Sequence, residues 1–292
     1  MYDISTYEEA TTIQEALQYL KENPSSKVIA AGSDVLIKIR EGKMAGASLV
    51  SIIKIEELKK IEKDKDGNIH IGPLVNFTQL EEDPIIREHL PYLGQGGGTM
   101  GGPQLRNIAS IGGNICNGAT SADSGSTLVC LNAQLTLTSL DLERVVPIGE
   151  FYTGPGRVDL KAGELLTDIV ILRQDYEGYV GKYTKFAQRK SMDIATIGCA
   201  VMMKLQGRVI EDFRLAYGVA APTPVRCPVA EAYAKGLTLT KENARAIGEK
   251  ALEDVSPRDS WRGSKAYREQ LIKVLAERAI WELANGGGEQ DA

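Results

Sequence analysis

The 292-residue sequence predicts an α+β fold in two domains, and three observations support this prediction. Short strand-like and helical segments mix through about residue 176 without a regular βαβ alternation, which argues against a doubly wound sheet. The polar, glycine-containing segment YEGYVGK then gives the best candidate for a domain boundary. Beyond it, two strand-like segments precede two long amphipathic helices, so a second and smaller α+β unit is expected to follow the first.

In the first domain, a helix is expected over residues 12–23, where Thr12 and Glu15 have capping-box spacing before an amphipathic run. A second box, Thr78 with Glu81, predicts a short helix that ends before a proline. The strand-like segments are 28–31, 48–55, 68–75, 134–139, 144–148 and 165–173, with a turn at Asp66–Gly67 and a hairpin formed by 134–139 and 144–148.

In the second domain, strands are expected at 199–205 and 213–220, around a turn at Gly207–Arg208. Helices are expected over 241–255 and 264–284, where apolar residues keep helical spacing. The predicted division is therefore a first domain of residues 1–176, a C-terminal domain of residues 177–285 and a disordered tail of residues 286–292.

Composition excludes several classes of function. The formal net charge of -5 leaves no basic field for phosphodiesters, so no nucleic-acid partner is expected. The N-terminal segment has no charged leader before an apolar block, and no run of about eighteen apolar residues occurs. We therefore expect no membrane association and a cytoplasmic location.

The cysteine and histidine inventory also limits the chemistry. The four cysteines are scattered and form no C-x-x-C pair, so a zinc or iron-sulfur site is not expected on this chain. Only two histidines occur, His70 in a strand-like segment and His89 in REHLP, and neither has a metal-ligand partner at suitable spacing. A Ser-His-Asp or Cys-His catalytic group is thus nearly excluded, and no catalytic residue is assigned.

Four polar or glycine-containing segments are candidates for ligand contact. GQGGGTMGG contains a formal G-x-G-x-x-G at Gly96, Gly98 and Gly101, but it lacks the preceding strand, so a flexible loop is expected there. AAGSDVL contains either backbone N–H groups that converge on an anion or a turn closed by the Asp34 side chain, and the sequence leaves both readings open.

The third candidate, SIGGNICNGATSADSGS, is denser in small polar residues than a turn requires, which favours ligand contact. Its two adjacent glycines allow the main chain to approach a ligand closely. The fourth, KYTKFAQRKSMDIATIG, gathers Lys185, Arg189 and Lys190 in an acidic chain, as either a binding cluster or a solvated charge run.

Taken in order, AAGSDVL, GPQLRNIASIGGNICNGATSADS, GELLTDIVI, KFAQRKSMDIATIG and LAYGVAAPTPVRC resemble the FAD-binding subunit of the molybdenum hydroxylases, the xanthine dehydrogenase family. The resemblance covers nearly the whole chain. It implies a two-part FAD-binding domain of the vanillyl-alcohol-oxidase/MurB type, followed by a smaller α+β C-terminal domain. Because neither histidine lies in a motif that matches a flavin attachment site, noncovalent FAD is expected.

The resemblance also implies which residues contact FAD. In the family, the first motif wraps the pyrophosphate with backbone N–H groups, the Gly-Gly motif and a downstream carboxylate follow, and an aliphatic and a cationic contact complete the site. Carried over to this sequence, the cofactor-binding residues are Val28, Ile29, Ala30, Ala31, Gly32, Ser33, Asp34, Val35, Met100, Ser110, Ile111, Gly112, Gly113, Asn114, Ile115, Asp123, Leu166 and Lys185.

The implied function is electron exit from a heteromeric oxidoreductase. A large subunit with molybdopterin would hydroxylate the substrate, 2Fe-2S clusters on a small subunit would relay the electrons, and FAD on this chain would pass them to NAD. A dimer of heterotrimers is expected. Xanthine is preferred as the substrate, with nicotinate, carbon monoxide or an aldehyde as alternatives. Two rivals stay open: a nucleotide-binding subunit without electron traffic, and a free-standing MurB-type flavin oxidoreductase.

Overall fold

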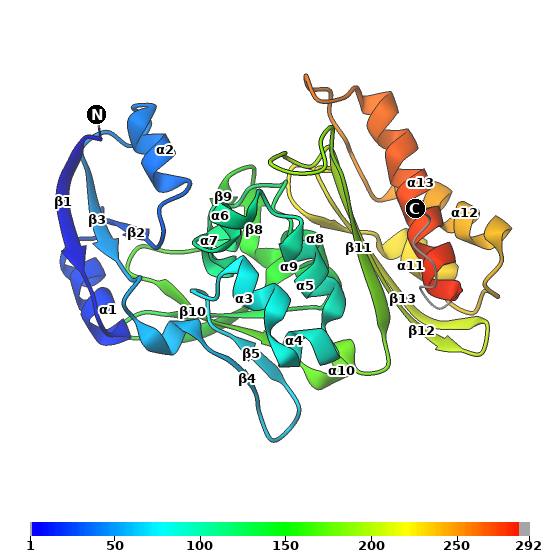
Figure 1. Ribbon diagram of the computed structural model, residues 1–292, viewed down its shortest axis with the longest axis horizontal. Helices are drawn as coiled ribbons and strands as arrows, with labels where there is room; N and C mark the ends of the chain where they lie inside the picture. The colour runs from blue at the N-terminus through cyan, green and yellow to red at the C-terminus, as the bar shows by residue number, and fades with distance from the viewer. Residues whose placement is uncertain (1, 286–292) are drawn as a thin grey trace.

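The computed structural model describes residues 2–285 as three main β-sheets with helices packed around them (Figure 1). The elements of the first unit are β1 (Ile4–Glu9), α1 (Ile13–Glu22), β2 (Lys27–Ile29), α2 (Val35–Arg40) and β3 (Ala47–Ser51). The three strands are parallel, in the order β1-β3-β2. A short βαβ alternation thus does occur here. The sequence patterns miss β1, because most of its residues are exposed and no apolar alternation marks it.

The second unit is an antiparallel five-stranded sheet in the order β4-β5-β10-β6-β7, with a separate two-stranded β8-β9 pair. Its strands are β4 (Ile61–Lys63), β5 (Ile69–Ile71), β6 (Gln134–Thr138), β7 (Glu143–Pro147), β8 (Tyr152–Gly154), β9 (Arg157–Val158) and β10 (Leu165–Ile171). Its helices are η1 (Glu56–Lys59), α3 (Phe77–Glu82), α4 (Pro84–His89), α5 (Pro91–Gly98), α6 (Pro103–Arg106), α7 (Ile111–Cys116), α8 (Gly125–Cys130), α9 (Ile148–Phe151) and α10 (Arg173–Tyr176). The predicted hairpin is confirmed as β6-β7.

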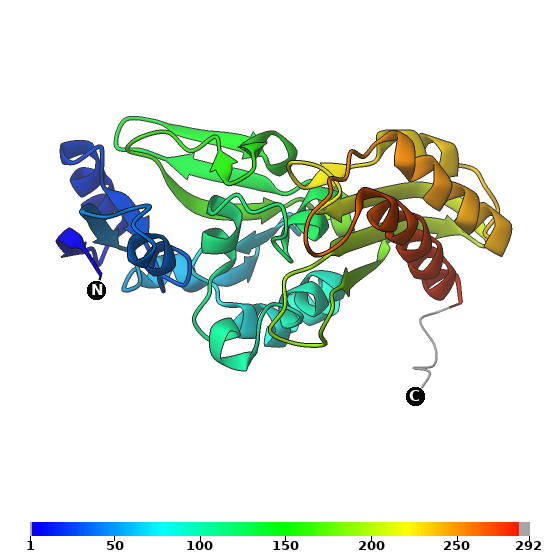
Figure 2. The ribbon, with the colours of Figure 1, turned by 90° about the horizontal axis from the view of Figure 1, so that it is seen from above.

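The third unit is a four-stranded antiparallel sheet, β11-β12-β13-β14, covered by helices. Its elements are β11 (Val180–Phe186), β12 (Ile197–Gln206), β13 (Val209–Gly218), β14 (Val225–Arg226), α11 (Pro228–Ala234), α12 (Lys241–Lys250), η2 (Ala251–Glu253) and α13 (Lys265–Ala284). The predicted strand pair and the two long helices are confirmed. Figure 2 shows the three units following one another along the long axis, with α13 near the end opposite the N-terminus.

The sheet β11-β14 is buried on both faces. Ala200 and Met202 of β12 pack into the core of the second unit, whereas Val201 and Met203 pack against the C-terminal helices. This explains the continuous apolar run of β12, since a strand that is covered on both sides has no polar face. Because β11 contacts both α5 and α13, the division at residue 176 stays a prediction.

Two local predictions are wrong in detail. The helix α3 begins with a capping box formed by Asn76 and Gln79, not by Thr78 and Glu81. Asn76 accepts a hydrogen bond from the Gln79 N–H at 2.8 Å, and the Gln79 side chain accepts one from the Asn76 N–H at 3.1 Å. This placement buries Phe77 and leaves Thr78 half-buried, with its hydroxyl donating to Asn107 Oδ1 at 2.6 Å.

The glycine-rich segment that was expected to be a flexible loop is helical over residues 94–98, which form the end of α5, and only residues 99–102 lie outside the helix. A Cβ on Gly97 would lie 3.1 Å from the Phe77 ring, and one on Gly96 would lie 3.2 Å from the Tyr183 ring. The glycines therefore allow a helix to pack closely between aromatic side chains. Within residues 2–285, no helix is long and apolar enough to span a bilayer. The tail predicted to be disordered, residues 286–292, lies outside the described residues.

Candidate functional site

The first motif lies between the end of β2 and the start of α2. Gly32 has a φ of 78° and is buried, so a side chain at this position would be strained. Among residues 2–285, no acceptor bonds to the N–H groups of Ala31, Gly32, Ser33 and Asp34. The Asp34 side chain forms no cap hydrogen bond, which removes the reading of this segment as a turn closed by that side chain. Four adjacent free N–H groups are suited to an anionic ligand.

The second motif forms a helix, α7, rather than a loop. The Ser110 hydroxyl begins it by accepting a hydrogen bond from the Gly113 N–H at 3.2 Å. The Ile111 N–H donates to the Val75 carbonyl and the Gly112 N–H donates to the Pro73 carbonyl, each at 2.9 Å. The N–H groups of Ile111, Gly112 and Gly113 are thus bonded within the protein and are not free for a ligand.

The two glycines of α7 have different surroundings. A Cβ on Gly112 would lie 2.4 Å from Pro73 Cβ, so this glycine is required by packing within the protein. Gly113 is exposed, and a Cβ there would meet only the Ser110 hydroxyl, at 3.0 Å. Close approach of a ligand is therefore possible at Gly113 and not at Gly112.

Polar contacts join the first motif to the second. Lys38, on α2, donates to Asn117 Oδ1 at the end of α7 over 2.7 Å. Asn114, within α7, accepts a hydrogen bond from the Ser124 hydroxyl at 2.7 Å. Ser124 follows Asp123 in the chain. These two hydrogen bonds, together with the backbone of α7, therefore link α2 to the predicted carboxylate.

The two predicted charged residues are in direct contact. Lys185, on β11, bonds Asp123 Oδ2 at 2.8 Å and the Thr99 carbonyl at 3.0 Å. Tyr183 donates to the other oxygen of Asp123 at 3.0 Å. Burial raises the pKa of Asp123, and the Lys185 ammonium and the Tyr183 hydroxyl oppose that rise. Lys185, Asp123, Tyr183 and the Thr99 carbonyl, which directly precedes Met100, thus form one buried polar cluster.

Other predicted residues are held in apolar cores. Leu166 is 2% exposed and Met100 is 8% exposed, and both belong to the core of the second unit. The aliphatic side chains within the motifs are partly or fully covered as well: Val28, Ile29, Val35, Ile111 and Ile115. A contact from Leu166 or Met100 to a flavin stays a prediction.

The three cations of the fourth segment do not form one cluster. Lys185 is buried and paired, whereas Arg189 and Lys190 are exposed. Arg189 donates to the Met192 carbonyl at 2.7 Å and lies 3.7 Å from Asp193, so it stabilises its own loop. A hollow of about 260 Å³ lies between this loop, Thr99 and Lys185.

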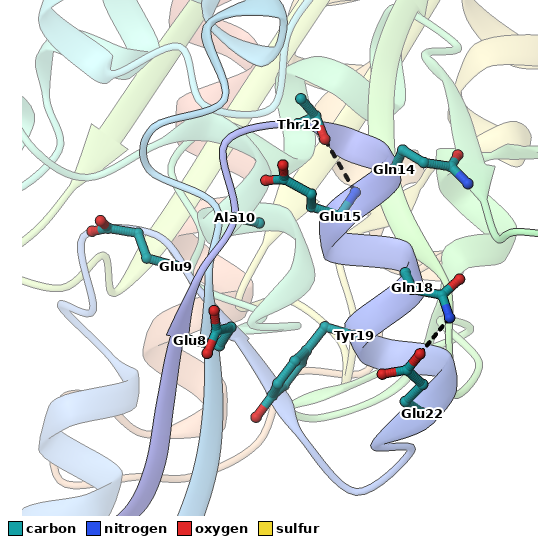
Figure 3. A pocket seen from close by; sticks show the side chains of 9 residues that line it. All are labelled: Glu8, Glu9, Ala10, Thr12, Gln14, Glu15, Gln18, Tyr19 and Glu22. Carbon is teal, nitrogen blue, oxygen red and sulfur yellow. Dashed lines mark hydrogen bonds between the residues drawn. The ribbon is translucent and has the colours of Figure 1, made fainter.

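A hollow of about 570 Å³ lies elsewhere, between β1 and α1 (Figure 3). Four of its lining residues are glutamates, Glu8, Glu9, Glu15 and Glu22. Hydrogen bonds from Thr11 lower the pKa of Glu15, which keeps that carboxylate charged. Carboxylates repel a pyrophosphate. No group of three or more metal-ligating side chains occurs among the described residues, so neither an FAD site nor a metal site is indicated there.

The residues present fit an FAD pyrophosphate at the first motif. Ala31 to Asp34 carry four consecutive N–H groups that have no acceptor among the described residues, and Gly32, within this segment, has no side chain. Lys38 adds a cation one helical turn away. These are the donor types that bind phosphate in a protein whose overall charge is negative.

Sequence reasoning missed Tyr183 and Lys38. Tyr183 stands two residues before Lys185 in a strand, and residues at that spacing lie on one face of the sheet. This signal could have identified Tyr183 once Lys185 was chosen. Lys38 carries no comparable signal, because its partner Asn117 lies far away in the sequence.

His70 is paired with two carboxylates, and none of these three residues belongs to the four candidate segments for ligand contact. It lies 2.6 Å from Asp168 Oδ2 and 3.4 Å from Asp64 Oδ2. Burial by itself lowers the pKa of His70, but the hydrogen bonds and charges of Asp168 and Asp64 outweigh it, and the pKa is raised. Protonated His70 therefore stabilises the fold fully below about pH 6.5, and this contribution is lost as the pH rises through the higher folded-state pKa.

We expect the unfolding free energy of the wild type to decline from pH 6 to pH 8 more steeply than that of His70→Gln. Urea denaturation at several pH values measures this difference. His89→Gln, which leaves His70 and both carboxylates in place, is expected to keep the wild-type slope. Equal slopes for the wild type and His70→Gln would contradict a raised His70 pKa.

Comparison with known proteins identifies relatives along the whole chain. Residues 2–174 match the family model of the FAD binding domain in molybdopterin dehydrogenase, and residues 182–283 match the CO dehydrogenase flavoprotein C-terminal domain. The xanthine dehydrogenase FAD-binding subunit of Escherichia coli is 42% identical over 99% of each chain. The nicotinate dehydrogenase FAD-subunit of Eubacterium barkeri is 32% identical over 93% of each chain.

A solved structure has the same fold. Carbon monoxide dehydrogenase from Hydrogenophaga pseudoflava, in a form that lacks the Mo-pyranopterin moiety of the molybdenum cofactor, superposes with a TM-score of 0.90. The sequences are 26% identical, and the match covers 96% of this chain and 97% of the other. The two-domain α+β fold is thereby confirmed.

Proposed function

Because the chain belongs to the family of FAD-binding domains in molybdopterin dehydrogenases, we propose that it is the FAD-carrying electron-transfer subunit of a multi-subunit molybdenum hydroxylase. One observation carries the proposal: polar contacts link the segment of free N–H groups, Ala31–Asp34, through Lys38 and α7 to the region of the Asp123–Lys185 pair. This region contains the donors that a pyrophosphate requires and a buried ion pair between Asp123 of the second unit and Lys185 of the third.

The chain's own residues have distinct roles in this proposal. The N–H groups of the first motif and Lys38 hold the pyrophosphate, while the exposed face at Gly113 allows the main chain to approach. Asp123 and Lys185 set the electrostatic environment of the buried end. Bound FAD supplies hydride and single-electron exchange, and the protein controls its orientation and potential.

The substrate, the electron acceptor and the partner subunits are proposed from the likeness to the family and its members. Xanthine is proposed as the substrate of the partner subunit, because the 42% identical relative is a xanthine dehydrogenase subunit; nicotinate, carbon monoxide or an aldehyde is the alternative. We propose NAD as the electron acceptor. The proposed partners are a molybdopterin-binding large subunit and a small subunit with 2Fe-2S clusters, in a dimer of heterotrimers in the cytoplasm.

The purified protein tests the proposal directly. We expect a yellow protein that releases FAD on denaturation and whose flavin absorbance bleaches when NADH is added. Affinity purification from the native host is expected to bring down molybdenum and iron with the chain. A colourless protein without FAD would overturn the proposal, and turnover of a substrate by the isolated chain would favour a free-standing oxidoreductase of the MurB type.

Lys185 is expected to tune the potential of the bound flavin. Replacing it by alanine removes a positive charge that is 9% exposed and therefore poorly screened by solvent. We expect the reduction potential to fall by about 30 mV, equivalent to about 1.4 kcal/mol for a two-electron couple. Lys190→Ala, which removes an exposed charge nearby, is the control and should leave the potential near that of the wild type. No change in Lys185→Ala would remove this role.

A further inference from the structure

The hydroxyl of Tyr183 forms a hydrogen bond with the buried carboxylate of Asp123. It donates to Asp123 Oδ1 at 3.0 Å, while Lys185 occupies Oδ2 at 2.8 Å. Both oxygens of the carboxylate are thus bonded by groups from one strand, β11. Tyr183 is 7% exposed and Asp123 is 5% exposed, so water does not compete freely for these bonds.

Two glycines fix the position of the Tyr183 ring. A Cβ on Gly198 of β12 would lie 2.8 Å from the Tyr183 hydroxyl oxygen, and one on Gly96 of α5 would lie 3.2 Å from the ring. The phenol therefore fills the space that these residues leave free, between the second unit and the third. A side chain at position 198 would therefore displace the hydroxyl, and one at position 96 would crowd the ring.

We propose that Tyr183 is a positioning residue that keeps Asp123 ionised and directed at Lys185. The inference rests on the proposed function, because Asp123 and Lys185 form the buried end of the proposed FAD site. If the carboxylate were protonated, the Lys185 ammonium would lose its counter-charge and the site would gain a net positive charge. Tyr183 thus favours the ion pair over a site in which Asp123 is protonated.

The balance of charges around Asp123 supports this role. Burial raises the pKa of Asp123, and only the Lys185 ammonium and the Tyr183 hydroxyl work against it. On β12, the residue paired with Tyr183 is Ala200, and the nearby thiol of Cys199 belongs to the core on the other face of the sheet. Burial raises the pKa of Cys199, so this thiol carries no charge near neutral pH. Loss of the Tyr183 hydroxyl therefore removes one of two groups that favour the carboxylate.

A titration of the apoprotein tests the proposal without any cofactor. The carboxyl carbons of aspartate are labelled with carbon-13, Asp123→Asn assigns the signal, and NMR follows its pH dependence in the wild type and in Tyr183→Phe. We expect the midpoint for Asp123 to move upward by about one pH unit, the size expected for one hydrogen bond to a charged group. An unchanged midpoint would overturn the proposal.

Two further variants separate this role from a structural one. Tyr217→Phe removes another buried hydroxyl, which donates to the Ile272 carbonyl at 2.8 Å against the C-terminal helices, and should leave the Asp123 midpoint in place. Gly198→Ala, which displaces the Tyr183 hydroxyl, should raise the midpoint as Tyr183→Phe does, even if one of the two variants folds poorly. A raised midpoint in Tyr217→Phe would contradict a specific role.

The FAD-loaded protein distinguishes failure of this inference from failure of the proposed function. We expect the flavin potential of Tyr183→Phe to rise relative to that of the wild type as the pH falls through the shifted Asp123 midpoint. Wild-type protein that binds no FAD would overturn the proposed function and leave the apoprotein titration as the test of Tyr183. Protein that binds FAD normally, with the same pH profile in both forms, would overturn the inference alone.

Discussion

Replacing Gly112 by alanine is expected to destabilise the protein by about 3 kcal/mol, because the added Cβ would be forced into the main chain of Pro73. The Cβ would lie 2.4 Å from Pro73 Cβ and 2.7 Å from the Pro73 carbonyl oxygen. That carbonyl also accepts the hydrogen bond of the Gly112 N–H, so the substitution disturbs the start of α7 as well. The unfolding midpoint in urea and the FAD content of the purified variant measure the effect.

Two matched variants separate packing from cofactor contact. Gly149→Ala introduces the same methyl into another short helix, where nothing lies within 4 Å, and should be neutral or stabilising by about 0.5 kcal/mol. Gly113→Ala places a methyl on the exposed face of α7, so it should lower FAD content while changing stability by about 1 kcal/mol or less. Wild-type stability in Gly112→Ala would refute the contact with Pro73.

Replacing Arg214 by alanine is expected to lower the unfolding free energy by about 3–5 kcal/mol, because the change leaves a buried carboxylate unpaired. Arg214 lies on β13 and pairs with Asp175 of α10 at 2.9 Å, with the two side chains only 10% and 7% exposed. It also donates to the Cys130 carbonyl at the end of α8, at 3.0 Å. The residue thus joins the third unit to the second by charge and by hydrogen bonds.

The control is a pair of the same type on the surface. Arg173 and Glu177 lie 2.6 Å apart, with side chains 56% and 57% exposed, so Arg173→Ala should change the stability little. Calorimetry or urea unfolding of both variants gives the comparison. A loss in Arg214→Ala no larger than that in Arg173→Ala would mean that the units are held together by apolar contacts alone.

Sequence patterns predicted the parts of the fold whose signals are local. The helices α1, α12 and α13 and the β6-β7 and β12-β13 pairs follow from periodicity and turn residues. The sequence alone does not determine where α3 begins, because two pairs in one short run have capping-box spacing: Asn76 with Gln79, and Thr78 with Glu81. Burial of Phe77 and Leu80, a tertiary effect, selects the first of these.

In the candidate site too, local sequence patterns identified some features, while contacts between residues far apart in the chain decided others. The motifs located the segments that meet, and Asp123 and Lys185 do form one cluster. The sequence could not show that the N–H groups of Ile111 and Gly112 are already bonded, since their acceptors lie more than thirty residues earlier in the chain. A glycine pair signals close approach of the main chain, but what approaches is decided by tertiary structure.

The double burial of the sheet β11-β14 has a consequence for how the polypeptide can be divided. A fragment that ended at the predicted boundary would leave the buried side chains of α8 facing water, and the complementary fragment would expose Ala200, Met202 and Ala216 on an open strand surface. Such surfaces associate with one another, so separate expression of the halves should produce aggregates rather than two soluble proteins. Although two family models divide it, the chain is therefore expected to fold as one unit.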